Sequence, residues 1–282
     1  MIKKLIISFS ILLASIFFIT ACSDGVSLEG GPKVDDPVYS NNSKFTIQKG
    51  NYLYFTNGLL SYEELAEGDN DYGNVKNSAI YRQKLDDKGN IELNEDGEKL
   101  KPELLASKVV GYENGGMYIY EDKLYFATPT NRRDRTGEIR YDLVDFYSIN
   151  LDGSNPQRIY ETSNLGGEGF EFKFINHNNS LNLYTIESSE LKMLNIAGND
   201  VSGPFSISEN IETFEFDIKK ERILYTRELR DSDKYSSSKG NLLVSVNFGS
   251  DEENVLIRDN KHDYSIKAII DNILYYTRSG GQ

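Results

Sequence analysis

The sequence predicts an all-β fold, a β-propeller of four-stranded antiparallel blades. One order of short strands recurs along residues 44–282, and tyrosine recurs at one position of the second strand in every copy. Turn residues such as Asp, Gly, Asn and Ser follow the third strand in each of the first four copies. A two-sheet sandwich would also contain many short strands, but it would not repeat this order.

The clearest copy spans residues 116–162. Its strand segments, in order, are GMYIYED, KLYFAT, DFYSINLD and QRIYET, with the turn sequence DGSNP before the last. The alternation of apolar and polar residues and the β-branched and aromatic content are typical of strands. This copy therefore predicts one antiparallel unit.

Five copies align on the second strand. The reference residues are Tyr54, Tyr125, Tyr184, Tyr225 and Tyr275. We expect four full blades at about 44–110, 111–163, 169–208 and 211–260, and half a blade at 263–282. Because each sheet buries both faces against its neighbours, one copy alone would not be stable.

The fifth copy has an inner strand and a second strand only. The sequence therefore predicts an incomplete, open, crescent-like ring in which the apolar edge of residues 273–276 is unpaired. Two explanations stay open at this point: a truncated gene product, or a partner that completes the ring.

The first residues precede the repeats. A basic start at Lys3 and Lys4, an apolar run over 5–19 and small residues before Cys22 predict a signal peptide at 1–21. The segment Ile-Thr-Ala-Cys resembles a bacterial lipobox, which implies lipidation of Cys22, the only cysteine. The alternative is an ordinary signal peptide with an incidental cysteine. Residues 22–43 are small, polar and interrupted by proline, as in a flexible tether.

The lipobox resemblance implies a location. The mature protein is expected at the outer face of the cytoplasmic membrane or at another envelope membrane, held through lipid on Cys22. The net charge of the full chain is −13, and removal of Lys3 and Lys4 with the signal peptide would make it more negative still. Such a charge disfavours nucleic acid, whose phosphates the protein would repel. The same negative charge disfavours electrostatic binding to anionic lipid.

Three copies carry extra residues between their second and third strands, at 58–77, 129–143 and 228–239. Equivalent loops of successive blades emerge on one face, so these loops are candidates for a binding surface. Drift in solvated loops is the alternative. The candidate binding residues are Glu63, Glu64, Asp69 and Asp71 in the first loop and Arg132, Arg133, Arg135 and Arg140 in the second. The arginines could hold an anionic group of a partner, or the two loops could pair with each other or with water.

No catalytic motif, nucleotide-binding loop or cofactor motif is recognisable, so no catalytic residue and no cofactor are assigned. The two histidines, His177 and His262, lie in polar segments and are expected to be exposed turn residues. One weak calcium-like spacing contains Glu92, Asn94, Asp96 and Glu103. Because Pro102 and the glutamate in the first position suit calcium poorly, we interpret this segment as a hairpin and assign no metal.

Two stretches of the second copy carry a family resemblance. LYFAT and FYSINLDGSNPQRIY resemble a blade of bacterial secreted propellers related to the YWTD propellers of lipoprotein receptors and, more loosely, to TolB-type propellers. The resemblance implies the fold over about 44–282 far more than a role, because the bacterial members are mostly of unassigned function. The chain has no tryptophan, so the receptors' ligand sites are no guide.

These observations favour a lipid-anchored, extracytoplasmic binding or scaffold module of the cell envelope. Its partner would be a protein, peptide or glycan met on the long-loop face. A carbohydrate-active propeller hydrolase or lyase is one alternative, and a pair of facing carboxylates with shifted pKa values in the central funnel would favour it. A lipoprotein sensor of a membrane signalling system is another.

Overall fold

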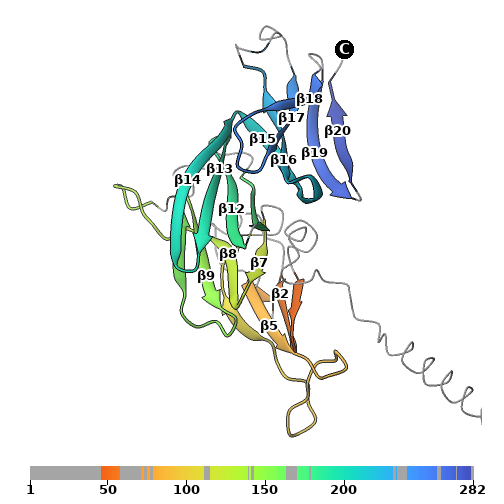
Figure 1. Cartoon of the computed structure of the whole chain (residues 1–282). Helices are drawn as coiled ribbons and strands as arrows, with labels where there is room; N and C mark the ends of the chain where they lie inside the picture. Colours follow the sequence, from red (N-terminus) through yellow and green to blue (C-terminus); the bar gives the residue numbers. More distant parts are fainter. Residues whose placement is uncertain are drawn as a thin grey trace, which may run out of the picture. The chain divides into compact units, whose positions relative to one another are not determined.

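The computed structural model is shown in Figure 1. It describes residues 46–57, 71–72, 75–76, 79–110, 115–138, 140, 143–162, 170–177, 179–230, 233, 240–258, 262–270 and 272–280. The chain divides into two compact units, Met1–Gly31 and Pro32–Gln282, and every described residue belongs to the second. The predicted signal peptide, Cys22 and the tether lie outside the described residues. No helix in the described part is long and apolar enough to cross a membrane.

The first four predicted copies each form a four-stranded antiparallel sheet, called blades 1 to 4 here. Blade 1 has the order β1 (Thr46–Lys49), β2 (Tyr52–Asn57), β5 (Ala79–Lys84) and β6 (Glu103–Ala106). Blade 2 has the order β7 (Met117–Tyr120), β8 (Lys123–Pro129), β9 (Val144–Asn150) and β10 (Gln157–Glu161).

Blades 3 and 4 repeat this order. Blade 3 contains β11 (Phe172–His177), β12 (Ser180–Glu187), β13 (Glu190–Ala197) and β14 (Asp200–Glu209). Blade 4 contains β15 (Ile211–Asp217), β16 (Arg222–Glu228), β17 (Asn241–Asn247) and β18 (Asn254–Arg258), with the short 3-10 helix η2 (Ile218–Lys220) between its first two strands.

Blade 5 is a two-stranded sheet of β19 (Asp263–Ile270) and β20 (Ile273–Ser279). A further small hairpin, β3 (Asp71–Tyr72) and β4 (Val75–Lys76), lies in the first long loop. The all-β propeller fold with four full blades and half of a fifth is therefore confirmed.

The connection between β12 and β13 shows how local chemistry sets the register. Ser188 and Ser189 both have positive φ, 52° and 61°, and Glu187 pairs directly with Glu190. A two-residue turn with left-handed backbone matches the twist of the strands that it joins. This is the copy in which the sequence predicts no long loop.

Strand β12 also shows why the blades pack side by side. Leu181 and Leu183 belong to the core that joins blades 1, 2 and 3, whereas Tyr184 and Ile186 belong to the core that joins blades 3 and 4. Successive side chains of a strand point to opposite faces, so one strand supplies two cores. Both faces of β12 are buried, as the repeat pattern predicts, whereas most of the outer strand β14 is exposed.

The last described strand has a different environment. Tyr264 and Ile266 of β19 are buried, but Ile273, Tyr275 and Tyr276 of β20 are 56%, 47% and 42% exposed. Among the described residues β20 pairs with β19 alone and β1 pairs with β2 alone. The predicted unpaired edge at residues 273–276 agrees with this pairing.

Candidate functional site

The second long loop contains an arginine hairpin, described at residues 132–138 and 140, which projects between β8 and β9 (yellow-green in Figure 1). The amide of Arg140 donates to the carbonyl of Arg132 at 2.9 Å, and the amide of Asp134 donates to the carbonyl of Glu138 at 2.8 Å. The Asp134 carboxylate accepts the amide and hydroxyl of Thr136 at 2.8 and 2.7 Å, and these bonds lower its pKa. The described residues of the hairpin are therefore joined by hydrogen bonds within the hairpin.

Two arginines of this region share one carboxylate at the outer strand of blade 2. Arg132 pairs with Glu161, and Arg158 lies 3.5 Å from the other oxygen of the same carboxylate. Arg158 also approaches the buried Asp145 at 3.6 Å. Burial raises the pKa of Asp145 in spite of this arginine and a hydrogen bond from Thr130. Arg132 therefore binds its own blade.

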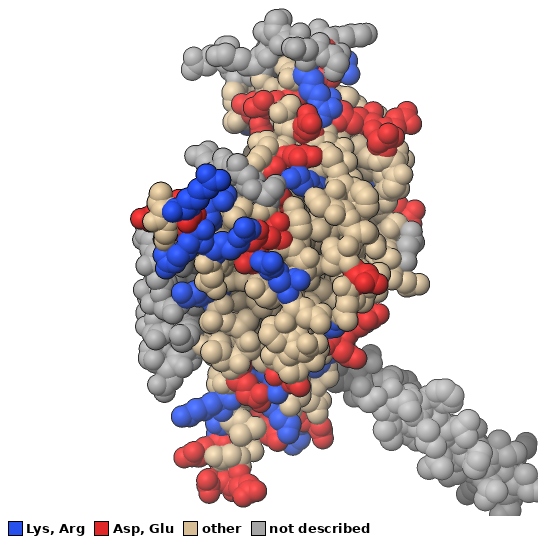
Figure 2. Space-filling model, turned by 90° about the vertical axis from the view of Figure 1, so that its left-hand side faces the viewer, with Lys and Arg blue, Asp and Glu red and all other residues tan. Residues whose placement is uncertain are grey.

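The remaining arginines of the hairpin differ in exposure. Arg133 and Arg135 are exposed, and Arg133 donates to the carbonyl of Gly137 at 2.6 Å, which holds its guanidinium on the hairpin. Arg140 is half-buried. Figure 2 shows basic side chains gathered on the side of the molecule from which the hairpin projects. A chain with a net charge of −13 thus presents a local basic surface.

The acidic candidates lie beyond what the structure describes. Glu63, Glu64 and Asp69 fall outside the described residues, and for Asp71 only the backbone position in β3 is described. The predicted pairing of the acidic loop with the arginine loop stays a prediction.

The calcium-like segment folds as a hairpin. Leu93 pairs with Lys99 in a β-bridge, and the Asn94 side chain accepts the amides of Asp96 and Glu98 at 3.0 and 2.8 Å. Two of its potential ligands have basic partners instead.

These two glutamates form ion pairs with basic residues of blade 1. Glu92 pairs with Lys84 at 2.8 Å, and Glu103 pairs with Arg82 at 2.7 Å. Within the described ranges, no group of three His, Cys, Asp or Glu side chains could hold a metal ion.

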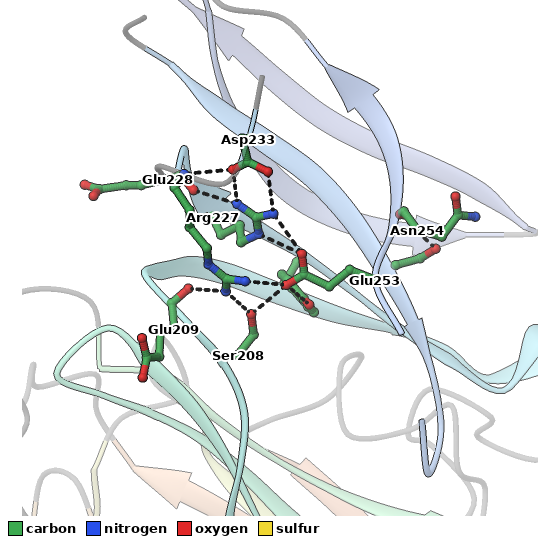
Figure 3. Close-up of polar contacts among 10 residues, drawn as sticks. Ser208, Glu209, Arg227, Glu228, Asp233, Glu253 and Asn254 are labelled. Carbon is green, nitrogen blue, oxygen red and sulfur yellow. Dashed lines mark hydrogen bonds and ion pairs between the residues drawn. The ribbon is translucent and has the colours of Figure 1, made fainter. Parts of the chain in front are cut away.

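Asp233, one of the described residues of the third long loop, belongs to an ion-pair network that the sequence did not predict (Figure 3). Arg227, at the end of β16, is 3% exposed and donates to both oxygens of Asp233 at 2.8 and 3.2 Å. It also donates twice to Glu253, at 2.8 and 3.0 Å. Arg227 therefore ties the loop after β16 to the segment before β18.

Glu253 is the acceptor at the centre of this network. Besides Arg227, it accepts hydrogen bonds from Ser208, Tyr225 and Arg230 at 2.9, 2.9 and 3.1 Å. Burial alone would raise its pKa, but the hydrogen bonds led by Arg227 outweigh burial and lower it. Ser208 lies on β14, so the network joins blade 3 to blade 4. Its charges are mutually neutralised, which indicates a structural role.

A second charge cluster lies on the inner strands of blades 3 and 4. Lys173 on β11 contacts Glu171 at 2.9 Å and Glu215 on β15 at 3.1 Å. Burial opposes the charge on Lys173, yet the two carboxylates more than compensate and raise its pKa. The two carboxylates are therefore bridged by an ammonium group, which is not the free acid pair that a glycosidase mechanism requires.

The prediction that His177 is exposed is wrong. Its side chain is 23% exposed, and its ring packs edge-on against Phe248 with centroids 4.5 Å apart. Phe248 lies just after β17, so the imidazole fills a gap between blades 3 and 4. His262 is half-buried and its Nε2 lies 2.7 Å from an Arg278 nitrogen.

No protein-family model and no curated protein matches the sequence. Among solved structures, the chain is similar to a prolyl endopeptidase with a TM-score of 0.47 and 10% identity, covering 83% of this chain and 32% of that one. It thus spans about a third of that protein's length.

Two similar structures match over most of both chains. The β-propeller domain of the Trilobed protease from Pyrococcus furiosus, described as having an open velcro topology, gives a TM-score of 0.32 at 11% identity, covering 84% and 78% of the two chains. The family 117 glycoside hydrolase Zg3597 from Zobellia galactanivorans gives 0.32 at 11% identity, covering 88% and 86%.

Proposed function

We propose that this protein is a lipid-anchored, extracytoplasmic binding module of the bacterial cell envelope. In this proposal the arginine hairpin engages an anionic group on a protein, peptide or glycan.

One observation carries the proposal. The hairpin is held by its own hydrogen bonds and presents exposed Arg133 and Arg135 on a chain that is otherwise strongly acidic. A preorganised loop loses little conformational freedom on binding. A guanidinium matches carboxylate, sulfate or phosphate groups through two parallel hydrogen bonds.

Reversing the two exposed charges tests the hairpin. Arg133→Glu combined with Arg135→Glu is expected to weaken binding to isolated envelopes of the producing bacterium by about tenfold or more, because attraction becomes repulsion. Binding of the parent protein should also weaken as salt rises. The measurement is co-sedimentation of a lipid-free form that lacks residues 1–22.

The matched control reverses Lys99 and Lys101, two exposed basic residues of blade 1. It changes the net charge by the same amount and should leave binding unchanged. Equal loss in both variants would point to net charge alone, and unchanged binding in the hairpin variant would exclude the hairpin as the contact.

Replacing Cys22 tests the anchor. Cys22→Ser in the full chain removes the only thiol that a lipobox could lipidate, so the protein is expected to leave the membrane fraction for the soluble fraction. Immunoblots of the two fractions measure this. A variant that stays with the membranes as the parent does would contradict lipidation at Cys22.

A further inference from the structure

A cavity of about 730 Å³ lies where blades 1 and 2 meet. Blade 1 contributes residues of the turn between β1 and β2, and blade 2 contributes residues of the turns after β7 and β9. The arginine hairpin follows the end of β8, whereas the turn after β7 precedes the start of β8. The cavity and the hairpin therefore lie at opposite ends of this strand. The cavity is shallow and largely open to solvent.

The floor of the cavity is aromatic and already assembled. The Arg82 guanidinium lies over the Tyr52 ring, 4.8 Å from its centroid, and the Tyr52 and Tyr54 rings are 6.4 Å apart. The Tyr54 hydroxyl and Arg82 both donate to the carbonyl of Leu151 in blade 2, at 3.4 and 3.1 Å. These contacts fix the half-buried Tyr52 ring before any ligand arrives.

The charge of Arg82 is already balanced. Its guanidinium donates to one oxygen of Glu103 through two nitrogens, at 2.9 and 2.7 Å. An anionic ligand would have to displace Glu103 or the Leu151 carbonyl to reach it. The geometry therefore disfavours an anion in this cavity.

The rim carries polar groups of both signs. Lys49 contacts the Glu121 carbonyl and lies 3.5 Å from the Asp122 carboxylate, whose side chain is 94% exposed. Asp152 accepts the amide and hydroxyl of Ser154, and these bonds lower its pKa, so it stays an acceptor. Lys49 and Asp122 thus offset each other, and the rim contains both donors and acceptors.

We propose that this cavity binds a neutral oligosaccharide. A pyranose ring has apolar C–H faces that pack on an aromatic ring and hydroxyls that both donate and accept hydrogen bonds. Such a ligand uses the Tyr52 ring together with carboxylates, an ammonium and the Asn150 amide, with no net charge to neutralise. The proposal is independent of the arginine hairpin.

Calorimetric titration of the lipid-free protein with cellotetraose, chitotetraose and maltotetraose tests this proposal. At least one of these sugars is expected to bind, and Tyr52→Ala should weaken it by about tenfold or more, because the aromatic floor is lost. Asp122→Ala removes an almost fully exposed side chain, so folding is unaffected, and it should weaken binding several-fold. The matched control, Tyr275→Ala, removes an exposed tyrosine of β20 and should bind as the parent does.

Three results would overturn the proposal. The first is that none of the three sugars binds. The second is that Tyr52→Ala and Asp122→Ala both bind as tightly as the parent. The third is that a neutral peptide such as tetra-alanine binds at this site while the sugars do not.

Discussion

Lys173→Met is expected to lower the free energy of unfolding by about 3–5 kcal/mol, because it leaves buried carboxylates without their cation. Lys173 is 4% exposed, and its ammonium donates to the Phe214 carbonyl at 2.6 Å as well as to the carboxylates of Glu171 and Glu215. Glu215 is 7% exposed and cannot recover the lost interaction from water. Urea unfolding followed by circular dichroism measures the change.

The Phe214 ring adds to the effect. The ammonium lies 4.7 Å from its centroid, so Lys173 loses a cation–π contact as well as its ion pairs when it is replaced. Methionine retains the length of the side chain, which keeps the packing change small. The measured loss therefore reports on charge more than on volume.

Two further variants make this prediction specific. Lys267→Met on β19 removes an exposed lysine whose ammonium donates a hydrogen bond to the Ser265 hydroxyl. This variant should change the free energy of unfolding by less than about 0.5 kcal/mol. Glu215→Gln added to Lys173→Met should recover part of the loss, since it removes one unpaired charge. Equal stability of parent and Lys173→Met would show that water reaches the cluster.

The blades could be predicted from sequence because their signals are local. The alternation of a strand is visible within a few residues of sequence. The turn after β9 also depends on local residues: the Asp152 carboxylate accepts a hydrogen bond from the Ser154 amide, and Gly153 adopts a φ of 83°. Neighbouring copies then had to pack, since each sheet has two apolar faces. The four-stranded blades are therefore predictable without knowledge of individual long-range contacts.

The interblade contacts could not be predicted in this way. Lys173 and Glu215 are 42 positions apart, and their contact depends on how two inner strands are set against each other. His177 stands in a polar stretch of sequence at the end of β11, yet its partner Phe248 comes from the next blade. Glu253 stands in an acidic run that is typical of a solvated turn. Composition gave no sign that one of these carboxylates is the centre of a network.

Arg227→Met is expected to lower the free energy of unfolding by about 3 kcal/mol or more, because Asp233 and Glu253 both lose their main donor. Arg227 is buried, and its partners are 12% and 21% exposed, so water replaces the lost hydrogen bonds only in part. Arg230 still reaches Glu253 at 3.1 Å, which keeps the loss at the lower end of the range for buried ion pairs. Urea unfolding at pH 7 measures it.

The dependence of stability on pH provides a second test of the same network. Arg227 lowers the pKa of Asp233 through its hydrogen bonds, and the pKa of Glu253 is lowered as well. A carboxyl group with a lowered folded pKa adds stability above its unfolded pKa, about 4, and loses it as pH falls through the folded pKa. The parent protein should therefore lose more stability between about pH 5 and pH 2 than Arg227→Met does.

Arg135→Met is the matched control for this prediction, because it removes the same charge from the exposed hairpin. Its stability at pH 7 should match that of the parent within about 0.5 kcal/mol, and its acid dependence should be unchanged. If Arg227→Met is as stable as Arg135→Met at pH 7, the network makes no net contribution to the free energy of unfolding. If the two variants lose stability in parallel on acidification, the carboxylates of Asp233 and Glu253 are not held in their charged form by Arg227.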